Sequence, residues 1–161
     1  MHNPLAVANW FIAEAKRQGR SCSQMQLHKL VFFAHAVSLA RGSGPLIRGE
    51  FVAMEYGPVH TELFDFTKGY GPNPIHNFIH VPNFPFITTL VIPWLETNSP
   101  AIDVCRQTWR NIGHLDNVGL CEFAFAPGAP WELAFDCGVN SRIPNESIAS
   151  FYSANNLFPL P

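Results

Sequence analysis

Apolar residues recur at intervals of three and four along the first part of the chain, and this spacing predicts two helices. The first is expected to begin at Asn3-Pro4, with Asn3 as N-cap and Pro4 at the first helical position, and to stop at Gly19. The second follows Ser23, which forms a capping box with Gln26. Its apolar face comprises Leu27, Leu30, Val31, Ala34 and Val37. We expect the two helices to pack as an antiparallel hairpin.

The pattern changes to strict alternation in residues 51–56, "FVAMEY", which predicts a short strand. The Gly57-Pro58 pair comes next and is interpreted as a corner between strand and helix. Glycine allows a sharp turn, and proline suits the first position of a helix because its missing N–H costs nothing there. The buried stripe of the helix that follows is expected to comprise Val59, Leu63 and Phe66, and Gly69 is expected to end it.

Six prolines between residues 72 and 100 exclude a long helix from the middle of the chain. This segment also holds Phe, Ile and Trp, so we expect an irregular insertion packed on the helical body; "FITTLVIPWL" within it suits a strand or a short helix. Further helices are predicted from Ser99-Pro100 to Gly113, over 117–125, after the turn "PGAPWEL", and from Asn145 as N-cap, before an extended tail "NNLFPLP".

Together these elements predict a mainly α fold with a small β element (α+β). We expect one compact helical domain over residues 1–161, with a divergent proline-rich insertion at about 72–100.

The composition points to a partner-binding protein. Hydrophobic residues make up 47% of the chain and charged residues 14%, below the usual quarter or so, and there are fourteen Phe. This balance favours an apolar surface that a partner covers. The formal net charge is −2, and the nearest approach to a basic cluster is Arg106 and Arg110. Nucleic-acid binding needs a basic stripe and is therefore not expected.

The four cysteines are Cys22, Cys105, Cys121 and Cys137, and no C-x-x-C pair is present. Charged residues interrupt the N-terminal apolar run, so a secretory signal is not expected, and reduced thiols in a cytoplasmic protein are the better interpretation. No apolar run approaches the roughly 18 residues of a membrane span. We therefore expect a protein that does not enter membranes.

Candidate catalytic and metal-binding residues all have simpler explanations. His76 and His80 have the spacing of helical zinc ligands, but prolines on both sides argue for loop histidines. His28 and His35 share one face of the second helix and are interpreted as its polar edge. No nucleotide-binding motif or nucleophile signature is present. We expect no enzyme, no metal and no cofactor; an unrecognised cysteine or histidine hydrolase stays open as an alternative.

Five segments, in order, resemble the Panacea domain family, which includes SocA-like antitoxins and phage-associated GepA-like proteins. They are "ANWFIAEAKRQG", "SQMQLHKLVFFAHAVSLA", "FVAMEYGPVHTELFDFTKGYG", "GAPWEL" and "IPNESIASFY". Within them, Leu27-His28-Lys29-Leu30, Tyr56-Gly57-Pro58-Val59 and Ala129-Pro130-Trp131 are similar to the family's motifs, although the family often has glutamine at His28 and tryptophan at Met54. Residues 72–127 match poorly.

The resemblance implies a non-enzymatic antitoxin that neutralises a cognate toxin by direct protein–protein binding. The SocA-like branch further implies an adaptor that delivers the toxin to a cytoplasmic protease. A phage or prophage accessory protein that binds and blocks a host or defence protein is the alternative.

We place the candidate partner-binding surface at the Gly-Pro corner and the start of its helix. It comprises Lys29, Glu55, Tyr56, Gly57, Pro58, His60 and Trp131. The simpler alternatives are core packing for Tyr56 and Trp131, and a helix-edge position for Lys29 in which its stem covers apolar surface.

Overall fold

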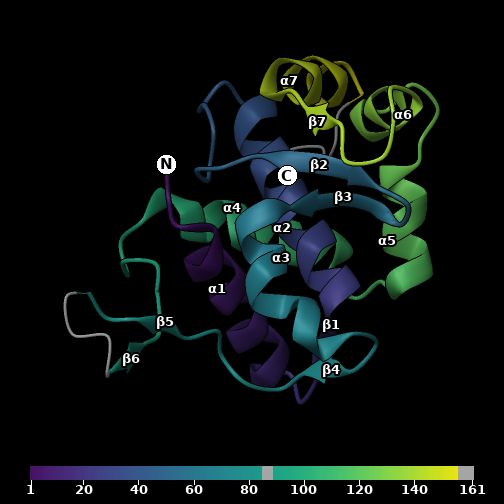
Figure 1. Cartoon of the computed structure of the whole chain (residues 1–161). Coiled ribbons are helices and arrows are strands. Elements are labelled where there is room, and N and C mark those ends of the chain that lie inside the picture. The colour runs from purple at the N-terminus through teal and green to yellow at the C-terminus, as the bar shows by residue number, and fades with distance from the viewer. Residues whose placement is uncertain (85–88, 156–161) are drawn as a thin grey trace.

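A computed structural model describes residues 1–84 and 89–155 of the chain. Within these residues the fold is α+β, as the sequence predicts, and its helices surround one central helix, α2 (Figure 1). The helices are α1 (Pro4–Arg17), α2 (Gln24–Ala40), α3 (Thr61–Thr67), the 3₁₀ helix η1 (Lys68–Tyr70), α4 (Pro100–Ile112), α5 (Asn117–Ala124), α6 (Pro130–Asp136) and α7 (Asn145–Ala154). The strands are β1 (Cys22–Ser23), β2 (Phe51–Met54), β3 (Gly57–His60), β4 (Pro74–Ile75), β5 (Val81–Pro82), β6 (Leu90–Val91) and β7 (Arg142–Ile143).

The caps of α1 and α2 are those predicted. The Asn3 side chain accepts a hydrogen bond from the Leu5 N–H, and Pro4 opens α1. The Ser23 hydroxyl and the Gln26 side chain form the reciprocal capping box of α2. Both helix starts are thus specified by residues next to them in sequence.

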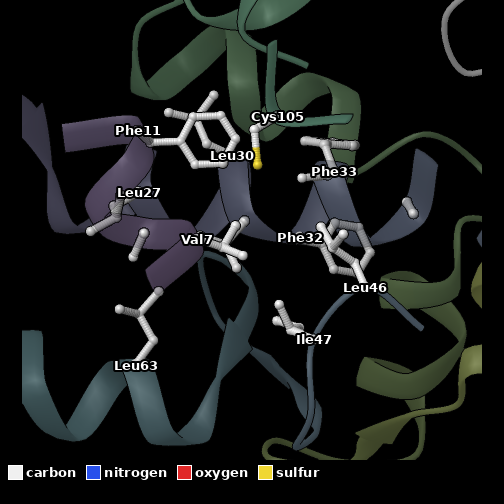
Figure 2. Packing of buried hydrophobic residues seen from close by; sticks show 14 of the residues in the cluster. Val7, Phe11, Leu27, Leu30, Phe32, Phe33, Leu46, Ile47, Leu63 and Cys105 are labelled. Carbon is white, nitrogen blue, oxygen red and sulfur yellow. The ribbon is translucent and has the colours of Figure 1, made fainter. Parts of the chain in front are cut away.

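Helix α2 is buried on every side from Leu27 to Ser38. It packs against α1, α4, α5 and α7, and strand β3 lies across it. Figure 2 shows Phe11, Leu30 and Cys105 meeting where α1, α2 and α4 come together, with Phe32 and Phe33 further along α2. A helix buried all round is the core of its domain rather than one of its faces.

The Gly-Pro pair lies in a strand, so its interpretation as a corner between strand and helix is wrong. Strands β2 and β3 form an antiparallel hairpin in which Ala53 pairs with Pro58, and β7 pairs on the other side of β2. Strand β3 is an edge strand of this sheet. The missing N–H of Pro58 costs as little stability there as it would at a helix start. The helix begins only at Thr61, and its N-cap is His60.

The later helix start shortens the apolar stripe of α3. Leu63 is fully buried as predicted, but Val59 belongs to the strand and Phe66 is 39% exposed. The buried residue one turn after Leu63 is Thr67, whose hydroxyl donates to the Leu63 carbonyl. The predicted stripe was therefore correct at Leu63 alone.

The proline-rich segment packs on the helical body through a few anchors. Strand β4 pairs with β1, and Ile75 and Ile79 are buried. The buried Asn9 amide donates to the carbonyls of Ile79 and Pro93, both at 3.0 Å, and its oxygen accepts from the Ile79 N–H at 2.7 Å. Beyond these anchors, β5 and β6 extend away from the body at the lower left of Figure 1.

The C-terminal helices follow the prediction with one shift. Helix α4 begins after Ser99 and ends at Gly113, and α5 covers most of the predicted range. Asn145 is the first residue of α7 rather than its cap, because its side-chain oxygen contacts His35 at 3.0 Å. The predicted extended tail "NNLFPLP" lies outside the described residues, apart from Asn155. The first three residues of "FITTLVIPWL" also lie outside them, and its Leu90 and Val91 form β6.

Candidate functional site

The β2–β3 hairpin reverses at Glu55 and Tyr56, which the turn presents to solvent. Gly57, directly after the turn, has a φ of 108°, a conformation that side chains disfavour. A Cβ at this position would lie 2.5 Å from Lys29 Cε and 2.7 Å from Lys29 Nζ. The positive φ therefore favours glycine here, and any side chain would also have to displace the end of Lys29.

Lys29 projects from the middle of α2 and is only 1% exposed. Within the part of the chain that the structure describes, its ammonium makes no hydrogen bond and no ion pair. Burial lowers the pKa of this ammonium to about 8, against an opposing effect of the Cys121 thiol. The helix-edge alternative for Lys29 does not hold, because α2 has neighbours on every side. Two of the motifs quoted above, one around Lys29 and one around Gly57, thus meet at one point.

His28 and His35 do not form a polar edge; both are buried and both bond to backbone. His28 Nδ1 accepts from the His60 N–H at 3.2 Å, and His35 Nδ1 accepts from the Ile47 N–H at 3.4 Å. Their Nε2 atoms face Thr67 and Asn145. Burial lowers the pKa of His28 to about 3 and that of His35 to about 4, so both rings are neutral and join α2 to the chain segments around it.

Trp131 supports the hairpin from the side. Its indole N–H donates to the Met54 carbonyl at 2.9 Å, and its ring lies against Phe125 and Phe135, with centroids 4.2 and 4.9 Å away. On the other side of the turn, the Cys121 sulfur lies 3.8 Å from the Tyr56 carbonyl oxygen. The turn is thus held by α5 and α6.

The structure divides the seven candidate residues into three groups. Glu55 and Tyr56 are exposed at the turn, Tyr56 by 61%, so core packing does not explain Tyr56. Trp131 is half-buried in the aromatic stack beside them. Lys29, Gly57, Pro58 and His60 are buried; the His60 ring is 2.9 Å from the Arg48 carbonyl oxygen and caps α3, so it shapes the hairpin from within.

Lys29, Glu55 and Tyr56 line one pocket of about 410 Å³ between α2, the hairpin and α3. Apolar side chains outside the predicted site form part of the wall of this pocket, namely Met25, Met54, Val59, Phe64 and Pro72. These residues come from four separate segments, and no local spacing links them. The sequence holds one signal for the burial of Lys29, the apolar run that directly follows it, "LVFFA", which is unusual beside a solvated lysine.

The other candidate catalytic and metal-binding residues do not come together into a site within the described residues. The four cysteines are free thiols; Cys22 and Cys105 are buried, and burial raises the pKa of Cys22 to about 11 and that of Cys105 to about 12. His76 and His80 lie in loops. The described residues bring together no group of three metal-ligating side chains, and none of their helices is long and apolar enough to cross a membrane.

Comparison with known proteins gives two matches. Residues 27–89 match the family described as "Antitoxin SocA-like, Panacea domain", and this range contains most of α2, the hairpin and α3. The chain is also 36% identical over 129 residues to the protein named Antitoxin SocA of Caulobacter vibrioides (strain NA1000 / CB15N). That alignment covers 80% of this chain and 68% of the relative. No solved structure matches the chain.

Proposed function

Because the chain belongs to the SocA-like Panacea domain family, whose name is that of an antitoxin, we propose that it neutralises a cognate protein toxin by binding it directly, without catalysis. The binding surface that we assign is the hairpin turn with Glu55 and Tyr56, together with the neighbouring parts of α5 and α6. The single observation that carries this assignment is the exposed Tyr56 on a turn that the body holds in place.

Tyr56 has the properties of a residue that dominates a protein interface. It is large, it is 61% exposed, and its backbone is fixed by the hairpin and by the contacts of Trp131 and Cys121. Tyrosine gives a large contact area for a small loss of side-chain freedom. The elements beside the turn add further exposed apolar side chains, namely Val118, Phe123 and Leu133. A partner that covers the turn would bury these as well.

Two modes of neutralisation follow from such a complex. In the simpler mode the antitoxin occludes the toxin. In the second, it acts as an adaptor and delivers the toxin to a cytoplasmic protease. The free thiols support a cytoplasmic site of action for either mode. A phage or prophage accessory protein that blocks a host or defence protein is the second candidate function, and it would use the same exposed surface.

Co-expression with the product of the neighbouring gene tests the proposal. We expect this chain to restore growth and to co-purify with that product. Growth rescue with a stable complex supports occlusion, and rescue with loss of the partner protein supports delivery to a protease. If the neighbouring product is not toxic and forms no complex, the antitoxin proposal fails and the accessory function takes its place.

The surface is tested separately by Tyr56→Ala. We expect this variant to lose at least about tenfold in toxin affinity, as is usual for a central interface tyrosine. Phe84→Ala is the matched control, since Phe84 is an exposed aromatic residue, 75% accessible, far from the turn in sequence. If Tyr56→Ala folds and equals Phe84→Ala in growth rescue and in toxin affinity, the turn is not part of the interface.

A further inference from the structure

The pocket beside the hairpin turn has the size of a binding site. Its volume of about 410 Å³ lies within the range of roughly 300–1,000 Å³ that ligand pockets occupy. Six of its lining side chains are apolar or aromatic: Met25, Met54, Tyr56, Val59, Phe64 and Pro72. The exposed Tyr56 belongs to this wall, so a partner that covers the turn also covers the opening.

Lys29 is the unusual member of the lining. Three other polar lining residues have partners: the Ser23 hydroxyl donates to Asn117 at 2.7 Å, Gln24 donates to Thr67, and both His28 ring nitrogens are engaged. The Lys29 side chain is only 1% exposed and lines the pocket, and in the described residues its ammonium has neither a hydrogen bond nor an ion pair. Glu55 lines the same pocket but forms no ion pair with Lys29. A buried cation without a counter-charge carries a large desolvation cost.

We propose that this pocket receives an acidic side chain of the partner toxin, with an apolar neighbour of that side chain against the pocket wall. The carboxylate would pair with the Lys29 ammonium, which the apolar wall already shields from water. Glu55 lines the same pocket but does not pair with Lys29, so the ammonium keeps its full capacity to bind the incoming carboxylate. This assignment rests on the proposed function, because it identifies what the toxin inserts at the surface assigned above.

Calorimetric titration of the purified chain with the product of its neighbouring gene tests the pocket. Lys29→Met keeps an unbranched apolar stem but removes the charge, and we expect it to weaken binding by at least about 30-fold. Lys29→Gln is the second variant, and circular dichroism verifies that both fold. Lys68→Met is the matched control: Lys68 is 58% exposed and pairs with Asp65, and its loss should change affinity by less than about twofold.

The acidic partner is identified from the toxin side. Each Asp and Glu of the toxin is replaced by its amide, singly and in combination with Lys29→Met. We expect one replacement whose effect disappears in the Lys29→Met background, since both changes break the same pair. That coupling is the result that supports the pocket.

The possible failures are distinct. If the wild-type chain binds no toxin, the antitoxin proposal and this inference both fall. If the wild-type chain binds but both Lys29 variants bind equally well, or if no acidic replacement couples to Lys29, the antitoxin proposal stands and the pocket assignment is overturned. Tight binding of sodium hexanoate alone, lost in Lys29→Met, would overturn it in favour of a small-molecule site.

Discussion

Replacing Lys29 with methionine should make the free protein more stable. The ordinary pKa of lysine is 10.5, and burial lowers that of Lys29 to about 8. The unfolded chain therefore binds this proton more tightly than the folded chain. At about pH 7 the difference corresponds to a cost of about 3 kcal/mol, at about 1.4 kcal/mol per pKa unit. Methionine removes this cost and keeps an unbranched apolar chain against the pocket wall.

The cost should disappear as the pH rises. Between about pH 8 and the ordinary value of 10.5, the unfolded state holds a proton that the folded state has lost, so the wild-type protein gains stability across this window. The Lys29→Met protein lacks this gain. The two stabilities should therefore differ by about 3 kcal/mol at about pH 7 and approach each other near pH 10.5.

Urea unfolding at a series of pH values, followed by circular dichroism, measures both effects. In a thermal melt at about pH 7, the gain corresponds to a rise in Tm of roughly 6–12 °C. A control is Lys68→Met, whose exposed lysine should leave the stability nearly unchanged. If Lys29→Met is less stable than the wild type at about pH 7, or if the two proteins keep the same pH slope, the ammonium is compensated in the folded state and the reasoning is refuted.

Three further changes test the fold around the site. Acidification from about pH 7 to 5 should lower the free energy of unfolding by about 4 kcal/mol. The folded pKa values of His28 and His35 are about 3 and about 4, below the ordinary 6.5, so the unfolded state takes up protons first. Urea unfolding of His35→Gln should show a smaller loss of stability over the same pH range. Gly57→Ala should destabilise the protein by about 2 kcal/mol or more in the same assay, through its φ of 108° and the clash beneath it, whereas an unchanged midpoint would contradict the packing. Asn9→Leu should cost about 3 kcal/mol by loss of three hydrogen bonds, and limited proteolysis should then cut the proline-rich segment faster than in the wild type.

The predictions that succeeded from sequence depend on near neighbours. The caps at Asn3 and Ser23 involve residues two or three positions away, so a short window contains the whole interaction. The Gly57-Pro58 pair failed for the opposite reason. Proline is tolerated both at a helix start and in an edge strand, and only the pairing of β3 with β2 decides between them.

The structure brings together only some of the residues that the sequence suggested for the partner-binding surface. The turn residues Glu55 and Tyr56 lie in the segment that the sequence singled out, and Lys29 lies in the same pocket. The burial of Lys29 and His28 was not predicted, because the prediction assumed one apolar face for this helix and gave no weight to the apolar run that follows Lys29. Helix α2 is covered on all sides because α4, α5 and α7 also pack against it. The spacing of apolar residues within α2 carries no information about these distant helices.

The anchoring by Asn9 has a consequence for how freely the chain can change. Asn9 bonds only to main-chain atoms of Ile79 and Pro93, and apart from the Ile79 N–H, which a proline would lack, these atoms are present whatever the side chains are. The stretch between the two anchor points can therefore exchange its residues, or lengthen and shorten, without loosening the attachment. The helical body can therefore stay unchanged while the proline-rich segment anchored to it varies in sequence and length.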